Sequence, residues 1–207
     1  MPLLYEYGNE FAKIAIWHIV ESKKFFLNKV PLQREISHPH KQLQHLAGRY
    51  LLQYMYADFP YDLIEIADTR KPFLPGEEYH FSISHCGDYA AAIVSKEKRV
   101  GIDVELVTPK IQKIQHKFLN DKEMSFVNSQ STNQLINQLT LLWCCKEAVF
   151  KWYANGGVDF KDHIHVQPFT FSDNAGTINC NFLKHGVTSL RINYKWFDGV
   201  CLAWVVS

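Results

Sequence analysis

The chain has 207 residues and a mass of 24.1 kDa, which suits one large domain or two small domains of about 100 residues each. Hydrophobic residues make up 47% and charged residues 21%, so the sequence lacks the low hydrophobicity and high charge of a disordered chain. The formal net charge of +1 excludes a global electrostatic field that would recruit nucleic acid or an anionic membrane.

Apolar runs and cysteines indicate the expected compartment. Residues 11–20 include Lys13 and His18 and are too few to cross a bilayer, which takes about 20 apolar residues. The start of the chain contains Glu6 and Glu10, unlike a secretory signal. The five cysteines form no C-x-x-C pair, so neither a disulfide framework nor a structural zinc site is expected. These features predict a cytoplasmic protein.

The first half of the chain is predicted to form a strand, a helix and a group of further strands. β-Branched and aromatic residues predict a buried strand over residues 13–21. Apolar residues at steps of three and four predict an amphipathic helix over residues 39–56. Strand-like runs follow at residues 80–84, 89–95 and 99–106, and their short connections predict an antiparallel meander.

The second half repeats this pattern. A strongly apolar helix is predicted over residues 134–155, with Gly156 and Gly157 supplying the left-handed residue that often ends a helix. Predicted strands then follow at residues 169–172, 177–182, 189–196 and 200–206.

The expected fold class is α+β, with two pseudo-symmetric halves in one chain. The halves are predicted at residues 1–102 and 103–207, each an antiparallel sheet packed with helix. Because ligands often bind between such halves, we expect the active site in the cleft between them.

Two carboxylates share one face of the strand predicted at residues 99–106. Asp103 and Glu105 are two residues apart, so their Cα atoms lie about 6.5 Å apart and their side chains can converge on one hard cation. An equally simple interpretation is that both side chains belong to the solvated face of an amphipathic strand.

The apolar helix carries an acid and a base on one stripe. Trp143, Glu147 and Lys151 are spaced four residues apart, so their side chains line up. An ordinary helix-stabilising Glu–Lys pair has the same spacing. The otherwise apolar helix favours a functional role, because partly buried charges usually need a partner or a ligand.

Other candidates for phosphate binding are few. The turn at residues 82–87 offers backbone N–H groups, a hydroxyl and an imidazole, although hairpin geometry alone could explain it. The sequence contains no P-loop, no G-x-G-x-x-G and no G-x-S-x-G motif, and its histidine pairs lack the partners of a zinc site.

Four short motifs, taken in order, resemble the signatures of the 4′-phosphopantetheinyl transferase superfamily. They are R-K-P-F-L at residues 70–74, F-S-I-S-H at 81–85, G-I-D-V-E at 101–105 and W-C-C-K-E-A-V-F-K at 143–151. The chain length is similar to that of the long, pseudo-dimeric Sfp-type class. Two positions depart from the family pattern: Cys86 stands where Ser is frequent, and Cys144 stands where Ser or Ala is usual. Neither position is a metal or phosphate ligand in the family.

This resemblance implies transfer of the 4′-phosphopantetheine arm from coenzyme A to a serine of an apo acyl or peptidyl carrier protein, with release of adenosine 3′,5′-bisphosphate. By the same resemblance, Asp103, Glu105 and Glu147 match the acidic Mg²⁺ positions. Glu147 is the candidate to help deprotonate the serine, while Lys151 holds the pyrophosphate and assists the leaving group.

The resemblance also implies cofactor-binding residues for coenzyme A. Lys71, Ser84 and His85 match positions around the nucleotide, and Arg34 is the candidate for a further basic contact, in a more divergent region.

The basic run Lys110, Lys113, His116 and Lys117 could meet an acidic helix of the carrier by charge complementarity, or it could be a solvated helix face.

Two other functions have the same residue pattern. One is a non-catalytic module that binds coenzyme A or the carrier protein, and the other is a Mg²⁺-dependent hydrolase of nucleotide pyrophosphates. The intact acidic residues and Lys151 argue against the loss of catalysis. We expect a monomer that has no nucleic acid or membrane partner.

Overall fold

The computed structural model describes residues 2–32, 35–127 and 131–207. The chain divides into two compact units, Met1–Val100 and Gly101–Ser207, whereas the sequence placed the boundary after residue 102. Each unit combines an antiparallel sheet with helices, so the α+β expectation is confirmed. Within the described ranges, every helix is too short or too polar to cross a membrane.

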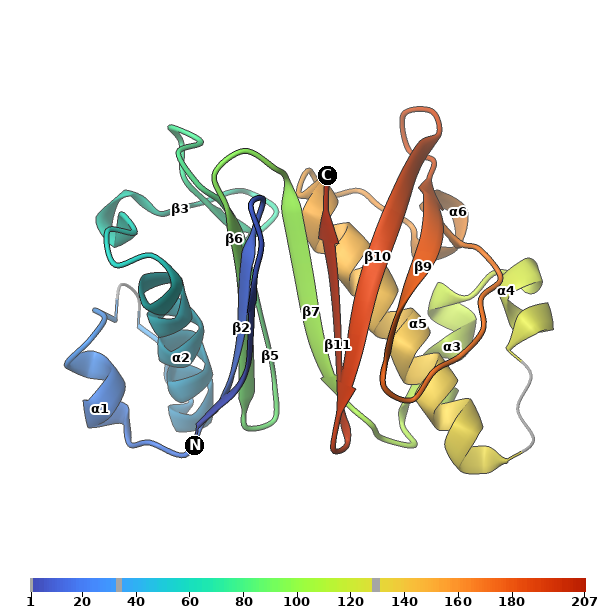
Figure 1. Cartoon of the computed structure of the whole chain (residues 1–207), viewed down its shortest axis with the longest axis horizontal. Coiled ribbons are helices and arrows are strands. Elements are labelled where there is room, and N and C mark those ends of the chain that lie inside the picture. The colour runs from blue at the N-terminus through green and yellow to red at the C-terminus, as the bar shows by residue number, and fades with distance from the viewer. Residues whose placement is uncertain (1, 33–34, 128–130) are drawn as a thin grey trace. The chain divides into compact units, whose positions relative to one another are not determined.

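Unit 1 has a four-stranded sheet with the order β1-β2-β6-β5 and antiparallel pairing throughout. Helix α2 packs on this sheet and α1 packs on α2, as the blue-to-green part of Figure 1 shows. The elements are β1 (Leu3–Gly8), β2 (Lys13–His18), α1 (Lys23–Leu27), α2 (Pro39–Met55), η1 (Tyr61–Leu63), β3 (Glu65–Ile66), β4 (Pro72–Phe73), β5 (His80–Cys86) and β6 (Tyr89–Ser95).

The apolar stripe of α2 forms the core of unit 1 against the sheet. Leu46, Leu51 and Leu52 on the helix are fully buried with the alanines and valine of β6. The small side chains of β6 let the helix approach closely, so burial of the stripe holds the helix on the sheet.

Unit 2 has a five-stranded sheet with the order β7-β11-β10-β9-β8. Helix α5 packs on β11, β10 and β8, and its apolar residues share one core with these strands. The elements are β7 (Val100–Leu106), α3 (Ile111–Phe118), α4 (Asp121–Phe126), α5 (Thr132–Tyr153), α6 (Phe160–His163), β8 (Ile164–Val166), β9 (Ala175–Phe182), β10 (Thr188–Phe197) and β11 (Val200–Val206).

The predicted meander is wrong at its third strand. β5 and β6 form the expected antiparallel pair, but β7 joins the other sheet beside β11. A short connection permits a hairpin without requiring it. Residues 100–104 are all buried: β7 pairs with β11 in the second sheet, and α5 packs against it at Gly101.

Two further expectations in unit 2 are wrong. Residues 169–172 form no strand, because the backbone N–H of Ser172 donates to Tyr194 Oη (3.2 Å) and the Phe171 ring packs on Trp196. Ala154, rather than a glycine, is the left-handed residue that ends α5, with φ of 72°. The sequence also missed β1, β8 and the short helices.

Candidate active site

Strand β7 and helix α5 touch along their backbones, and a glycine makes this contact possible. A Cβ on Gly101 would collide with the carbonyl oxygen of Ala148 and would lie 2.5 Å from the amide nitrogen of Trp152. Only glycine fits at this approach. The contact brings the following residues of β7 to the helix stripe that carries Glu147 and Lys151.

Asp103 is buried and paired with Lys151. Asp103 is 2% exposed, and its Oδ1 accepts a hydrogen bond from Lys151 Nζ at 2.5 Å. The Cys144 thiol donates to the Asp103 carbonyl oxygen (3.3 Å) and joins helix and strand a second time. A carboxylate this deeply buried requires a cation, so Asp103 does not lie on a solvated face.

Glu105 is partly buried and lies on β7 beside the indole of Trp143. The Trp143 Nε1–H donates to Glu105 Oε1 at 2.8 Å. Both side chains line a cavity of about 200 Å³ together with Lys110 and residues of α3 and α5. Glu105 therefore has a fixed hydrogen-bond partner and an approach from the cavity.

Glu147 is affected by the charges of both strand carboxylates. The pKa of Glu147 is raised to about 7, chiefly by burial and next by the negative charge of Asp103. Lys151 partly offsets this rise, and Glu105 adds a smaller increase. A carboxyl group whose pKa is near neutrality is suited to exchange a proton at physiological pH.

Lys151 stays protonated in this site. Burial disfavours its charged form, but Asp103 outweighs that effect by attraction and hydrogen bonding, and the net result is a raised pKa. The Lys151 ammonium therefore reaches from α5 to the strand carboxylate as a permanent positive charge.

The donor set fits a hard divalent cation by its chemistry. Asp103, Glu105 and Glu147 offer carboxylate oxygens, which Mg²⁺ prefers. The pKa of Glu147 is raised chiefly by burial and next by the negative charge of Asp103, and a bound cation would offset that negative charge. Among the residues that the structure describes, no three His, Cys, Asp or Glu side chains are already arranged as a metal site. Lys151 holds Asp103 Oδ1 instead.

A comparison of the sequence with protein-family models shows which family the chain belongs to. Residues 99–204, just over half of the chain, match the model described as the 4′-phosphopantetheinyl transferase superfamily. This chain belongs to that superfamily. The match contains all of the carboxylates described above, together with Trp143 and Lys151.

Several curated proteins are similar to this member of the superfamily. Enterobactin synthase component D of Escherichia coli (strain K12) is 33% identical over 126 residues, which are 54% of this chain and 54% of that protein. The 4′-phosphopantetheinyl transferase of Bacillus subtilis is 30% identical over 110 residues, 49% of each chain. The 4′-phosphopantetheinyl transferase gsp of Aneurinibacillus migulanus is 28% identical over 111 residues, 54% of this chain and 46% of that protein. The chain thus spans about half the length of the curated relatives it matches.

The predicted nucleotide-binding residues of this superfamily member lie in unit 1 and have different surroundings. Burial and repulsion by Arg99 lower the pKa of Lys71 to about 8. On β5, Ser84 is 5% exposed, whereas His85 is exposed, because successive strand residues face opposite sides. Arg34 lies outside the described residues.

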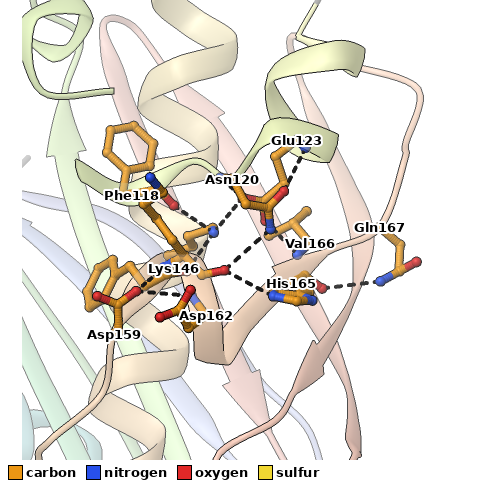
Figure 2. A network of polar contacts seen from close by, with 11 residues as sticks. Phe118, Asn120, Glu123, Lys146, Asp159, Asp162, His165, Val166 and Gln167 are labelled. Atoms are coloured by element: carbon orange, nitrogen blue, oxygen red, sulfur yellow. Dashed lines mark hydrogen bonds and ion pairs between the residues drawn. The ribbon is translucent and has the colours of Figure 1, made fainter. Parts of the chain in front are cut away.

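A buried ion pair in unit 2 was missed by the sequence analysis. Lys146 and Glu123 are joined by a 2.7 Å contact between Nζ and Oε2, and their side chains are 0% and 1% exposed. Figure 2 shows this network. The spacing N-x-x-E from Asn120 to Glu123, a capping-box pattern, was the available signal for α4, but it could not predict the distant lysine partner.

Proposed function

We propose that this protein transfers 4′-phosphopantetheine from coenzyme A to a serine hydroxyl of an apo acyl or peptidyl carrier protein, with Mg²⁺ bound. The observation that carries the proposal is the buried Asp103–Lys151 pair beside Glu147, on the strand and helix that the superfamily model matches. Membership of the superfamily and the names of the relatives support the same reaction.

The proposed reaction needs a group that removes the serine proton. The carrier serine Oγ attacks the phosphorus that bears the pantetheine arm, and the bond from that phosphorus to the bridging oxygen breaks. The serine proton passes to Glu147, the buried carboxylate of the α5 stripe beside Asp103. Adenosine 3′,5′-bisphosphate leaves with the electron pair of the broken bond.

The leaving group carries negative charge, and the protonated Lys151 is the residue to stabilise it. We propose that Asp103, Glu105 and Glu147 together hold Mg²⁺, which when bound supplies positive charge that polarises the pyrophosphate. Asp103 would then hold the cation in addition to its hydrogen bond from Lys151. Lys71, Ser84 and His85 are proposed to contact the nucleotide end of coenzyme A.

The carrier partner is proposed to dock on a basic helix. Lys113, His116 and Lys117 are exposed on α3, and Lys110 lies exposed at its N-cap. Lys110 also lines the cavity that contains Glu105. An acidic carrier helix placed here would gain electrostatic steering toward the site.

The deciding experiment is intact mass spectrometry of an apo carrier protein after incubation with the protein, coenzyme A and Mg²⁺. We expect the carrier to gain one phosphopantetheine mass, and no gain when EDTA replaces Mg²⁺. The matched variants are Asp103→Ala, which should lose the modification, and Asp62→Ala, an exposed aspartate of unit 1, which should keep it.

Other outcomes would point to the other two functions. Coenzyme A binding without carrier modification, across several carrier classes, would support a non-catalytic binding module. Release of adenosine 3′,5′-bisphosphate without carrier modification would support a pyrophosphate hydrolase.

A further inference from the structure

One of the three candidate metal carboxylates, Glu105, is held by a tryptophan. The Trp143 Nε1–H donates to Glu105 Oε1 at 2.8 Å across the contact between α5 and β7. An indole offers this one donor and no acceptor, so the bond restricts how the Glu105 carboxylate can be oriented.

Trp143 is itself held between two aromatic rings. The Phe118 ring packs edge-on at 5.2 Å between centroids, and the Phe160 ring lies at 5.5 Å and is tilted by 34°. Phe118 ends α3 and Phe160 begins α6, so the position of the indole depends on how these elements are placed against α5.

The buried lysine of α5 fixes both of these elements. Lys146 Nζ donates to the backbone oxygens of Phe118 (2.7 Å) and Phe160 (2.8 Å) and to Glu123 Oε2 (2.7 Å). These three bonds use every donor of the ammonium group. Lys146 thus binds the main chain of the same two residues whose rings hold Trp143.

Glu123 extends this anchor to the rest of unit 2. Its Oε2 also accepts from the Asn120 backbone N–H (3.0 Å), and its Oε1 accepts from the Val166 N–H (2.9 Å), as Figure 2 shows. The Glu123 carboxylate thus accepts hydrogen bonds from the N-cap of α4, from α5 and from β8. A fully bonded buried network of this kind has one low-energy arrangement, because breaking any bond leaves a buried polar group unpaired.

We propose that Trp143 is a positioning residue: its indole N–H orients Glu105 toward the divalent cation, and the buried Lys146–Glu123 pair holds the indole in place. This inference rests on the proposed function only for the presence of the cation. Hydrogen-bonding partners of metal ligands commonly change metal affinity by about 10- to 100-fold when they are removed.

The test measures metal binding directly, on the full chain with coenzyme A present. The Mn²⁺ dissociation constant is determined by electron paramagnetic resonance for the wild type, Trp143→Phe and Trp152→Phe. Trp152 lies on the same helix and donates its indole N–H to Ser207 Oγ (2.8 Å), which makes it the matched control. We expect an increase of about tenfold for Trp143→Phe and less than twofold for Trp152→Phe.

A spectroscopic measurement separates orientation from general stability. The chain has five tryptophans, so ¹⁵N-labelled protein gives five indole N–H signals, and Trp143→Phe assigns one of them. We expect Mg²⁺ to shift the Trp143 signal of the wild type and to leave the Trp152 signal in place. Equal Mn²⁺ affinity of Trp143→Phe and the wild type, or a Trp143 signal that does not respond to Mg²⁺, would overturn the inference.

These outcomes are distinct from those of the carrier assay. A wild type that binds Mn²⁺ with the predicted dependence on Trp143, yet modifies no carrier, refutes the proposed function and supports this inference. A wild type that modifies the carrier, while Trp143→Phe keeps full Mn²⁺ affinity, refutes this inference alone.

Discussion

At the scale of single residues, the site is defined by how charge is distributed among the carboxylates and one lysine. Asp103 is buried and paired with Lys151, so its negative charge is compensated within the protein. Glu147 lies among the same charges and has a pKa of about 7. The two carboxylates thus have different surroundings: Asp103 Oδ1 is bonded to Lys151, and Glu147 can exchange a proton near neutral pH.

The raised pKa of Glu147 predicts a loss of stability as pH rises in metal-free buffer. Between the usual value of 4.5 and about 7, the folded state holds a proton that the unfolded state has released. The free energy of unfolding should therefore fall across this window, at up to about 1.4 kcal/mol per pH unit. Urea denaturation of the wild type and Glu147→Gln in EDTA measures the difference, and parallel pH profiles would contradict this pKa.

Lys151→Ala should lower turnover much more than it weakens coenzyme A binding. In the proposed reaction the ammonium acts on charge that develops in the transition state, and loss of such a group typically costs about 100- to 1000-fold in turnover. Turnover and the coenzyme A dissociation constant are measured for Lys151→Ala and for Lys122→Ala, an exposed lysine of α4. Circular dichroism checks that Lys151→Ala is folded, since it leaves Asp103 buried without its cation. An unchanged turnover number would reduce Lys151 to a structural partner of Asp103.

At the scale of elements, the site depends on one close contact between β7 and α5. Gly101 permits the contact, the Cys144 thiol bonds the strand backbone, and Lys151 and Trp143 each bond a carboxylate of the strand. Four interactions of different kinds thus hold the same strand on the same helix. Displacing the strand would separate Asp103 and Glu105 from Glu147 at once.

Gly101→Ala should therefore reduce both stability and activity. The added methyl group meets helix backbone, which cannot rotate away, and overpacking of this kind costs about 1–3 kcal/mol or more. Gly76→Ala is the matched control, because a methyl group there has no atom within 4 Å. Thermal melts and carrier modification are measured for both variants. A Gly101→Ala protein that melts and reacts like Gly76→Ala would show that the contact is not required.

At the scale of the whole molecule, the near-neutral net charge leaves recognition to local patches. The exposed lysines of α3 form one such patch beside the cavity that Glu105 lines.

Charge reversal on α3 should weaken carrier use without affecting coenzyme A. For Lys113→Glu combined with Lys117→Glu, we expect the KM for the carrier to rise about tenfold or more at low salt. The KM for coenzyme A should stay unchanged, and the effect should shrink as ionic strength rises. Lys122→Glu, on α4, is the control. An equal rise in KM for the control would indicate a general charge effect in place of docking.

Local pattern in the sequence was sufficient for the main elements. Strand β2, helix α2, helix α5 and strands β9 to β11 lie where periodicity predicted them, because burial of one face imposes a regular spacing of apolar residues. The four motifs were sufficient for the family. The motifs can be recognised from the sequence because each is a short run of residues that are close together in the chain.

Only the tertiary structure decided which residues touch. Sequence spacing grouped Glu147 with Lys151 on one helix stripe, whereas the fold pairs Lys151 with Asp103, 48 residues away. It also paired Lys146 with Glu123 and Trp143 with Glu105, and it moved β7 from the predicted meander to the second sheet. These outcomes depend on long-range packing of α5 against β7, which periodicity within either segment does not contain.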